Sequence, residues 1–200
     1  IYLHIKHIVL SFSLLLAIDH GIAQACTSII IAGRATPDGR PIMWKNRDTD
    51  SYQNAIKYFD DGKFKSIGLI DADDPAGHAV WIGYNSAGFS IMNTASYNLI
   101  MKDTIDLKDQ EGILMREALK QCATVDEFGM FLKNHSKPLG VEANFGVIDA
   151  NGGAAYFEVS NFSFIKLDVN DPALAPMGYM IHTNFSFTGD PKSGTWQILY

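Results

Sequence analysis

Short strand-like segments occupy both halves of this chain, and a pair of helical segments separates them. The first helical segment covers residues 110–122, and Thr124-Val125-Asp126-Glu127 is a capping-box sequence that opens a second helix. Strands separated from further strands by paired helices predict an α+β domain, in which helices pack outside stacked antiparallel sheets. Segments rich in β-branched and aromatic residues predict strands at 27–31, 41–44, 64–70, 78–82, 89–93, 144–148, 154–159, 162–167 and 179–184.

The composition favours one globular domain and argues against several kinds of partner. Hydrophobic residues make up 47% of the chain and charged residues 19%, an ordinary globular balance. The net charge is −6 and the basic residues are scattered, so the chain has no basic stripe for nucleic acid and no patch for anionic lipid. The six histidines form no metal-binding motif, so we expect no metal site. Of the two cysteines, Cys122 lies on an apolar helical face and is expected to be buried.

Residues 1–25 have the parts of a secretory signal peptide. Basic residues near the start precede an apolar run from Ile8 to Ile18, and the small-residue sequence Ala23-Gln24-Ala25 follows. The apolar run is too short to span a bilayer. We therefore predict cleavage after Ala25, an extracytoplasmic location that is periplasmic or secreted, and a mature domain over residues 26–200. Because the chain stops within an apolar run, we expect this domain to be truncated at its C-terminus.

Cleavage after Ala25 would make Cys26 the first residue of the mature protein. An N-terminal cysteine carries a thiol and an α-amino group together, and the amine, with a pKa of roughly 7.7 to 8.0, can act as the base that activates the thiol. A signal that ends in Ala-Cys also occurs in lipoproteins, whose cysteine is acylated and serves as a membrane anchor. Lipoprotein signals usually carry leucine three residues before the cysteine, where this chain has Ala23. The junction alone leaves three roles open: nucleophile, anchor or inert residue.

The residues after this junction resemble the opening of the N-terminal-nucleophile (Ntn) hydrolases. The similarity is greatest to the superfamily of choloylglycine hydrolases, penicillin V acylases and acyl-CoA:6-aminopenicillanate acyltransferase-like proteins. It implies a four-layer αββα sandwich of two antiparallel sheets flanked by helices, without a cofactor. The matching segments are Cys26-Thr27-Ser28, Asp38-Gly39, Lys45-Asn46-Arg47-Asp48, Gly83–Gly88, Asn144–Asp149 with Gly152 and Glu158, and His182-Thr183-Asn184.

The resemblance also implies a role for each candidate site residue. Asp48 would orient the amine and thiol of Cys26. The choloylglycine branch has an arginine where this chain has Lys45, so the cationic role falls to Lys45 by alignment, with Arg47 in reserve. Asn184 matches an asparagine of the oxyanion hole, which binds the negative oxygen of the tetrahedral intermediate. Asn93 lies two residues out of register with a second such asparagine.

These features predict an exported cysteine amidase that cleaves a linear, non-peptide amide of a small molecule. An acyltransferase on the same fold, with an amine in place of water, is the first alternative. A non-catalytic surface lipoprotein acylated at Cys26 is the second. The substrate and the formation of a homo-oligomer are left open. An apolar acyl pocket could draw on several aromatic residues that are otherwise core candidates: Trp44, Tyr52, Tyr58, Phe59, Trp81 and Tyr97.

Overall fold

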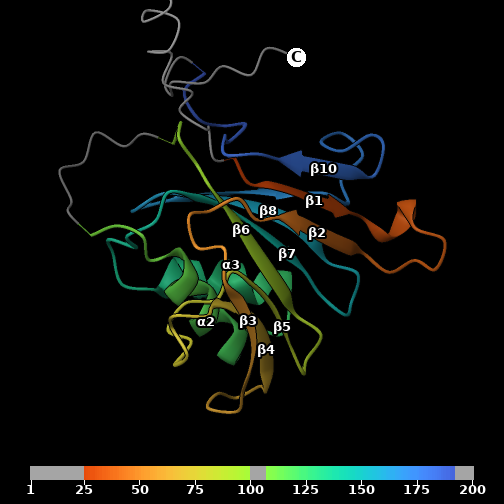
Figure 1. Ribbon diagram of the computed structural model, residues 1–200. Coiled ribbons are helices and arrows are strands. Elements are labelled where there is room, and N and C mark those ends of the chain that lie inside the picture. The colour runs from red at the N-terminus through yellow and green to blue at the C-terminus, as the bar shows by residue number, and fades with distance from the viewer. Residues whose placement is uncertain (1–24, 100–106, 192–200) are drawn as a thin grey trace, which may run out of the picture.

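The computed structural model describes residues 25–99 and 107–191, and it contains two antiparallel sheets packed face to face (Figure 1). The smaller sheet has the strand order β10-β1-β2, and the larger has the order β3-β4-β5-β6-β7-β8-β9. The elements are β1 (Thr27–Ile31), a short 3₁₀ helix η1 (Gly33–Ala35), β2 (Ile42–Asn46), β3 (Asn54–Phe59), β4 (Ser66–Asp71), β5 (Ile82–Asn85), β6 (Ser90–Ala95), α2 (Glu111–Gln121), α3 (Val125–Asn134), β7 (Ala143–Ile148), β8 (Ala154–Val159), β9 (Phe164–Asp168) and β10 (Tyr179–His182).

The predicted α+β class with stacked antiparallel sheets is confirmed. Figure 1 shows α2 and α3 on one side of the larger sheet and the smaller sheet on its other side. The described residues thus supply three layers of the sandwich: one of helices and two of strands. The predicted signal peptide falls outside the described residues, apart from Ala25.

Side-chain alternation in the larger sheet builds the two cores. Phe145 and Phe157 point to one face and pack with residues of both helices, such as Phe128. Tyr156, the residue before Phe157, belongs to the core between the sheets together with Ile30 of β1. Each strand of the larger sheet therefore contributes to the helical core and to the inter-sheet core in turn.

The helix predictions are confirmed in detail. The Thr124 side chain accepts a hydrogen bond of 3.1 Å from the backbone N–H of Glu127, the contact that a capping box requires. The Glu127 carboxylate in turn accepts from the backbone N–H of Ala123 at 2.6 Å. Cys122 ends α2 and is buried, as its place on the apolar face predicts.

Two strand predictions are wrong. Residues 78–81 form a loop and β5 begins only at Ile82, because the Asp74 carboxylate accepts hydrogen bonds from the backbone and ring of His78 and so closes a turn there. The second error is an omission, since β3 was not predicted. Among the described strands, β3 lies at the edge of its sheet and pairs with β4 alone. Its mostly exposed or half-buried side chains give little hydrophobic alternation.

The pairing of β1 brings the end of β2 and the end of β10 close to Cys26. Ser28 lies opposite Lys45 of β2 on one side and opposite His182 of β10 on the other. Cys26, just before β1, therefore sits where β2 ends and where the chain leaves β10. Within residues 25–99 and 107–191, no helix has the length and hydropathy required to cross a membrane.

Candidate active site around Cys26

Asp48 contacts both residues of the predicted cleavage junction. The backbone N–H of Ala25 donates a hydrogen bond to Asp48 Oδ2 at 2.8 Å. The Cys26 thiol lies 3.5 Å from the main-chain oxygen of Asp48 and donates to it. The loop after β2 thus holds its carboxylate against the chain immediately before the thiol, close to where a free α-amine of Cys26 would lie.

Lys45 brings a cation to the same place. Its Nζ donates to the Trp81 carbonyl at 3.0 Å and to Asn93 Oδ1 at 2.9 Å. Burial lowers the pKa of Lys45 to about 8; the negative charge of a Cys26 thiolate acts to raise it, and Arg47 acts to lower it further.

Arg47 is directed elsewhere. Its guanidinium pairs with Asp71 at 2.7 Å, donates to Asn54 and stacks over the Trp81 ring at 4.9 Å. Burial acts to raise the pKa of Asp71, but hydrogen bonds from Trp81 and Arg47 outweigh it and the pKa is lowered. Arg47 therefore ties the end of β2 to β3 and β4, while Lys45 is the cation that interacts with the thiol.

The two candidate oxyanion donors lie at the same end of the sandwich, and both are buried. Asn93 Oδ1 accepts the hydrogen bond from Lys45 Nζ described above. Asn184 Nδ2 donates one hydrogen to the Ala95 carbonyl at 3.1 Å, which leaves its second hydrogen available. The backbone carbonyl of Asn184 accepts from the Tyr97 N–H at 2.9 Å.

The aromatic residue Tyr97 lies at this site. The sequence indicated it only as one of six candidates for an acyl pocket. Burial raises the pKa of Tyr97, and the negative charges of Cys26 and Asp48 raise it further, which places the phenol near both groups. Trp81 reaches the site through its carbonyl, which Lys45 binds, while its ring lies under Arg47. The other candidates lie apart: Phe59 belongs to the helical core, and Trp44, Tyr52 and Tyr58 are exposed.

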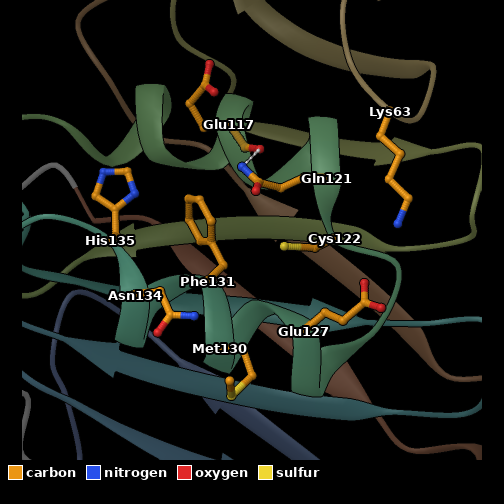
Figure 2. Close-up of a pocket in the computed structure, with 9 residues that line it drawn as sticks. All are labelled: Lys63, Glu117, Gln121, Cys122, Glu127, Met130, Phe131, Asn134 and His135. Atoms are coloured by element: carbon orange, nitrogen blue, oxygen red, sulfur yellow. Dashed lines mark hydrogen bonds between the residues drawn. The ribbon is translucent and has the colours of Figure 1, made fainter.

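The second cysteine lines a different cavity, between α2 and α3. This cavity has a volume of about 410 Å³. Figure 2 shows the side chains that line it, among them Cys122, Glu127 and Phe131. Burial and the nearby Glu127 carboxylate raise the pKa of the Cys122 thiol to about 12, so the thiol is protonated at neutral pH. This cavity on the helical face therefore holds no activated nucleophile. In the described parts of the chain, no three His, Cys, Asp or Glu residues are grouped to hold a metal ion.

Residues 34–194 match the family model described as acyl-coenzyme A:6-aminopenicillanic acid acyl-transferase. The chain belongs to this acyl-transferase family. The matched region includes Lys45, Asp48, Asn93 and Asn184, whereas Cys26 precedes it. Comparison with the curated proteins found no match to the sequence.

Solved structures place this member of the acyl-transferase family among the Ntn hydrolases by fold. An N-acylethanolamine-hydrolyzing acid amidase ortholog of Caenorhabditis elegans is 20% identical, with a TM-score of 0.58 over 80% of this chain and 70% of the other. A conjugated bile acid hydrolase mutant of Clostridium perfringens is 15% identical, with a TM-score of 0.52 over 77% of this chain and 52% of the other. The chain thus spans about half of the bile acid hydrolase. The predicted resemblance to Ntn hydrolases is confirmed at the level of fold and family.

Proposed function

We propose that this protein is an exported amidase whose nucleophile is the thiol of Cys26, freed by cleavage after Ala25, and whose substrates are linear non-peptide amides. The observation that carries the proposal is the placement of Cys26 beside the Lys45 cation and the Asp48 loop, with the Asn93 and Asn184 amides at the same end of the sandwich. Membership of the acyl-transferase family supports acyl-group chemistry at this site.

The proposed reaction forms and hydrolyses a thioester. The α-amine of Cys26 takes the thiol proton, and the thiolate attacks the carbonyl carbon of the amide. Asn184 Nδ2 and Asn93 Nδ2 donate to the oxyanion; one such donor is worth roughly 2.7 to 4 kcal/mol of barrier in other enzymes. The ammonium then protonates the leaving amine as the C–N bond breaks. Water attacks the thioester after losing a proton to the amine, and the acid leaves as the thiol re-forms.

Lys45 and Asp48 have separate parts in this scheme. Protonated Lys45 stabilises the thiolate by charge, since its pKa of about 8 keeps much of it protonated near neutral pH. The Asp48 carboxylate, which accepts from the N–H of Ala25, would hold the ammonium of the freed Cys26. A second function, transfer of the acyl group to an amine instead of water, is favoured by the description of the family model.

The identity of the mature N-terminus and of the acylated residue tests this proposal. The exported protein would be weighed intact, then mixed with N-acyl-4-nitroanilides of several chain lengths and quenched in acid. We expect a chain that begins with unmodified Cys26, release of nitroaniline, and an acyl mass on the peptide that begins at Cys26. A diacylglyceryl adduct would instead support the membrane anchor, and an acyl group on another residue would exclude Cys26 as the nucleophile. Adding a free amine as acceptor separates transfer from hydrolysis.

Replacing Lys45 by methionine should shift the pH–rate profile. The substitution removes a positive charge that would stabilise the attacking thiolate, so the acid limb of kcat/KM should move to higher pH, by about one unit. Arg47→Met is the matched control, because its guanidinium pairs with Asp71, and its profile should stay in place. Thermal melts would exclude misfolding. An unmoved profile for Lys45→Met beside a moved one for Arg47→Met would transfer the cationic role to Arg47.

A further inference from the structure

Three buried polar residues lie side by side across the larger sheet. Thr94 of β6 is opposite Asn144 of β7, and Asn144 is opposite Glu158 of β8. All three are almost fully buried. Their neighbours along the strands, such as Phe145, belong to the helical core, so the three polar side chains point to the other face of the sheet. We call them the polar row.

Thr94 and Asn144 bind the backbone on both sides of Asn184. The Thr94 hydroxyl donates to the Thr183 carbonyl at 2.7 Å and accepts from Asn144 Nδ2 at 3.1 Å. Asn144 Nδ2 also lies within hydrogen-bond distance of the Thr183 carbonyl at 3.4 Å and of the Phe185 carbonyl at 3.3 Å. The carbonyl groups of the residues before and after Asn184 are therefore both bonded to the row.

Glu158 holds the ends of the same segment. It accepts from His182 Nε2 at 2.9 Å and from the backbone N–H groups of Phe187 and Thr188 at 2.5 and 2.9 Å. The Thr188 hydroxyl donates to it as well. The carboxylate accepts these four hydrogen bonds and so holds the two ends of residues 182–188 together. We call these residues the Asn184 segment. Charged hydrogen bonds of this kind are among the stronger ones in proteins.

Burying these three polar side chains is costly, which argues that they do more than pack the two sheets together. A buried polar side chain is costly unless it is fully bonded, and apolar residues would pack the same sheet face more cheaply. The side chains of the row form their hydrogen bonds with the Asn184 segment or with one another. An amide that stabilises an oxyanion must be held in place before the reaction begins, because displacement by about 1 Å can cost on the order of a hundredfold in rate.

We propose that the polar row is a positioning element that fixes the Asn184 amide relative to Cys26. Thr94 and Asn144 set the backbone on either side of Asn184, and Glu158 clamps the ends of the segment. Because β10 pairs with β1, the segment that follows β10 is held at a fixed position relative to Cys26, which lies two residues before Ser28. The inference rests on the proposed function, since it assigns the row a part in acylation of Cys26.

A double-mutant cycle with Asn184 tests whether the row acts through that amide. The probe is p-nitrophenyl butyrate, and the rate measured is nitrophenolate release during acylation of the chain that begins at Cys26. We expect Asn144→Ser to slow acylation about tenfold to a hundredfold with little change in KM. Combined with Asn184→Ala, the same substitution should slow acylation by less than about twofold beyond Asn184→Ala alone, because its target amide is already gone.

Asn85→Ser is the matched control. Asn85 is also buried, and its amide donates to the Leu119 and Cys122 carbonyls at the end of α2. Its substitution removes a comparable number of buried hydrogen bonds, so it measures what a loss of stability alone does to the rate. Its effect should be small and should persist unchanged beside Asn184→Ala. Thr94→Val is the milder probe of the row because it keeps the side-chain shape, and Thr94→Ser should restore most of the rate.

The outcomes separate the two proposals. If release depends on Cys26 but the effects of Asn144→Ser and Asn184→Ala multiply, the row has no positioning role, and only this inference is overturned. Equal behaviour of Asn144→Ser and Asn85→Ser would overturn it too. If Cys26→Ala releases nitrophenolate as fast as the parent protein, the proposed nucleophile is wrong and the inference fails with it. Thr94→Val keeps the test informative if Asn144→Ser does not fold.

Discussion

Replacing Cys26 by alanine should abolish amide turnover, with a fall in kcat/KM of at least about a thousandfold. The reaction proposed here begins with attack by the Cys26 thiolate, and removal of a nucleophile costs other hydrolases on the order of a millionfold in kcat. The second thiol offers no substitute, because the pKa of Cys122 is raised to about 12 and its side chain is buried on the helical face of the larger sheet. Steady-state assays with a nitroanilide and acid-quenched mass spectra would measure the loss and the missing acyl-enzyme.

Cys122→Ala is the matched control for this prediction. Cys122 is the C-cap residue of α2, and the substitution removes its buried sulfur. It should therefore lower the free energy of unfolding by about 1 to 2 kcal/mol and leave most of the activity. Urea unfolding curves of both variants would show whether either is misfolded. Turnover retained in Cys26→Ala, or lost only in Cys122→Ala, would exclude the proposed nucleophile.

Local signals made most of the fold predictable from sequence. The capping box at Thr124, the apolar spacing of 110–122 and the turn residues between strands all act over a few residues, and the structure has the corresponding elements. β3 escaped prediction because an exposed edge strand lacks hydrophobic alternation. The loop at 78–81 was misread as strand because its apolar residues are typical of a strand, whereas the Asp74 side chain, four residues before His78, closes a turn there.

The candidate site was only partly predictable, because some of its contacts depend on how segments distant in the sequence pair with one another. The short spacing of Lys45 and Asp48 on one strand and loop could be matched to a family pattern, and both interact with Cys26. The choice between Lys45 and Arg47 depends on Asp71, whose position opposite Arg47 follows from strand pairing that no local pattern reveals. The polar row was unrecognised for a similar reason, since its members are 50 and 14 residues apart and meet only through register.

A protein that begins at Cys26 should cleave amides at least about a hundredfold faster than one that retains Ala25. In the chain that retains Ala25, the nitrogen of Cys26 is an amide and cannot take the thiol proton, and general-base catalysis contributes about 10²- to 10⁴-fold. The N–H of Ala25 also occupies Asp48 Oδ2 at 2.8 Å, the carboxylate proposed to hold the free ammonium. Removal of Ala25 thus creates the free α-amine that acts as the base, and it also frees the Asp48 carboxylate to bind that amine.

Two proteins that differ only by Ala25 would be compared across pH. In the shorter one, the acid limb of kcat/KM should include titration of the α-amine, with a pKa of roughly 7.7 to 8.0 before the effect of Asp48. In the protein that retains Ala25, the pH profile of kcat/KM should not show this titration. Asp48→Asn in the shorter protein separates the two effects, because it leaves the amine basic but removes the carboxylate that orients it. If the two lengths were equally active, the α-amine would not be the base. The thiol proton would then have to pass to another group near Cys26, such as Asp48 or Lys45.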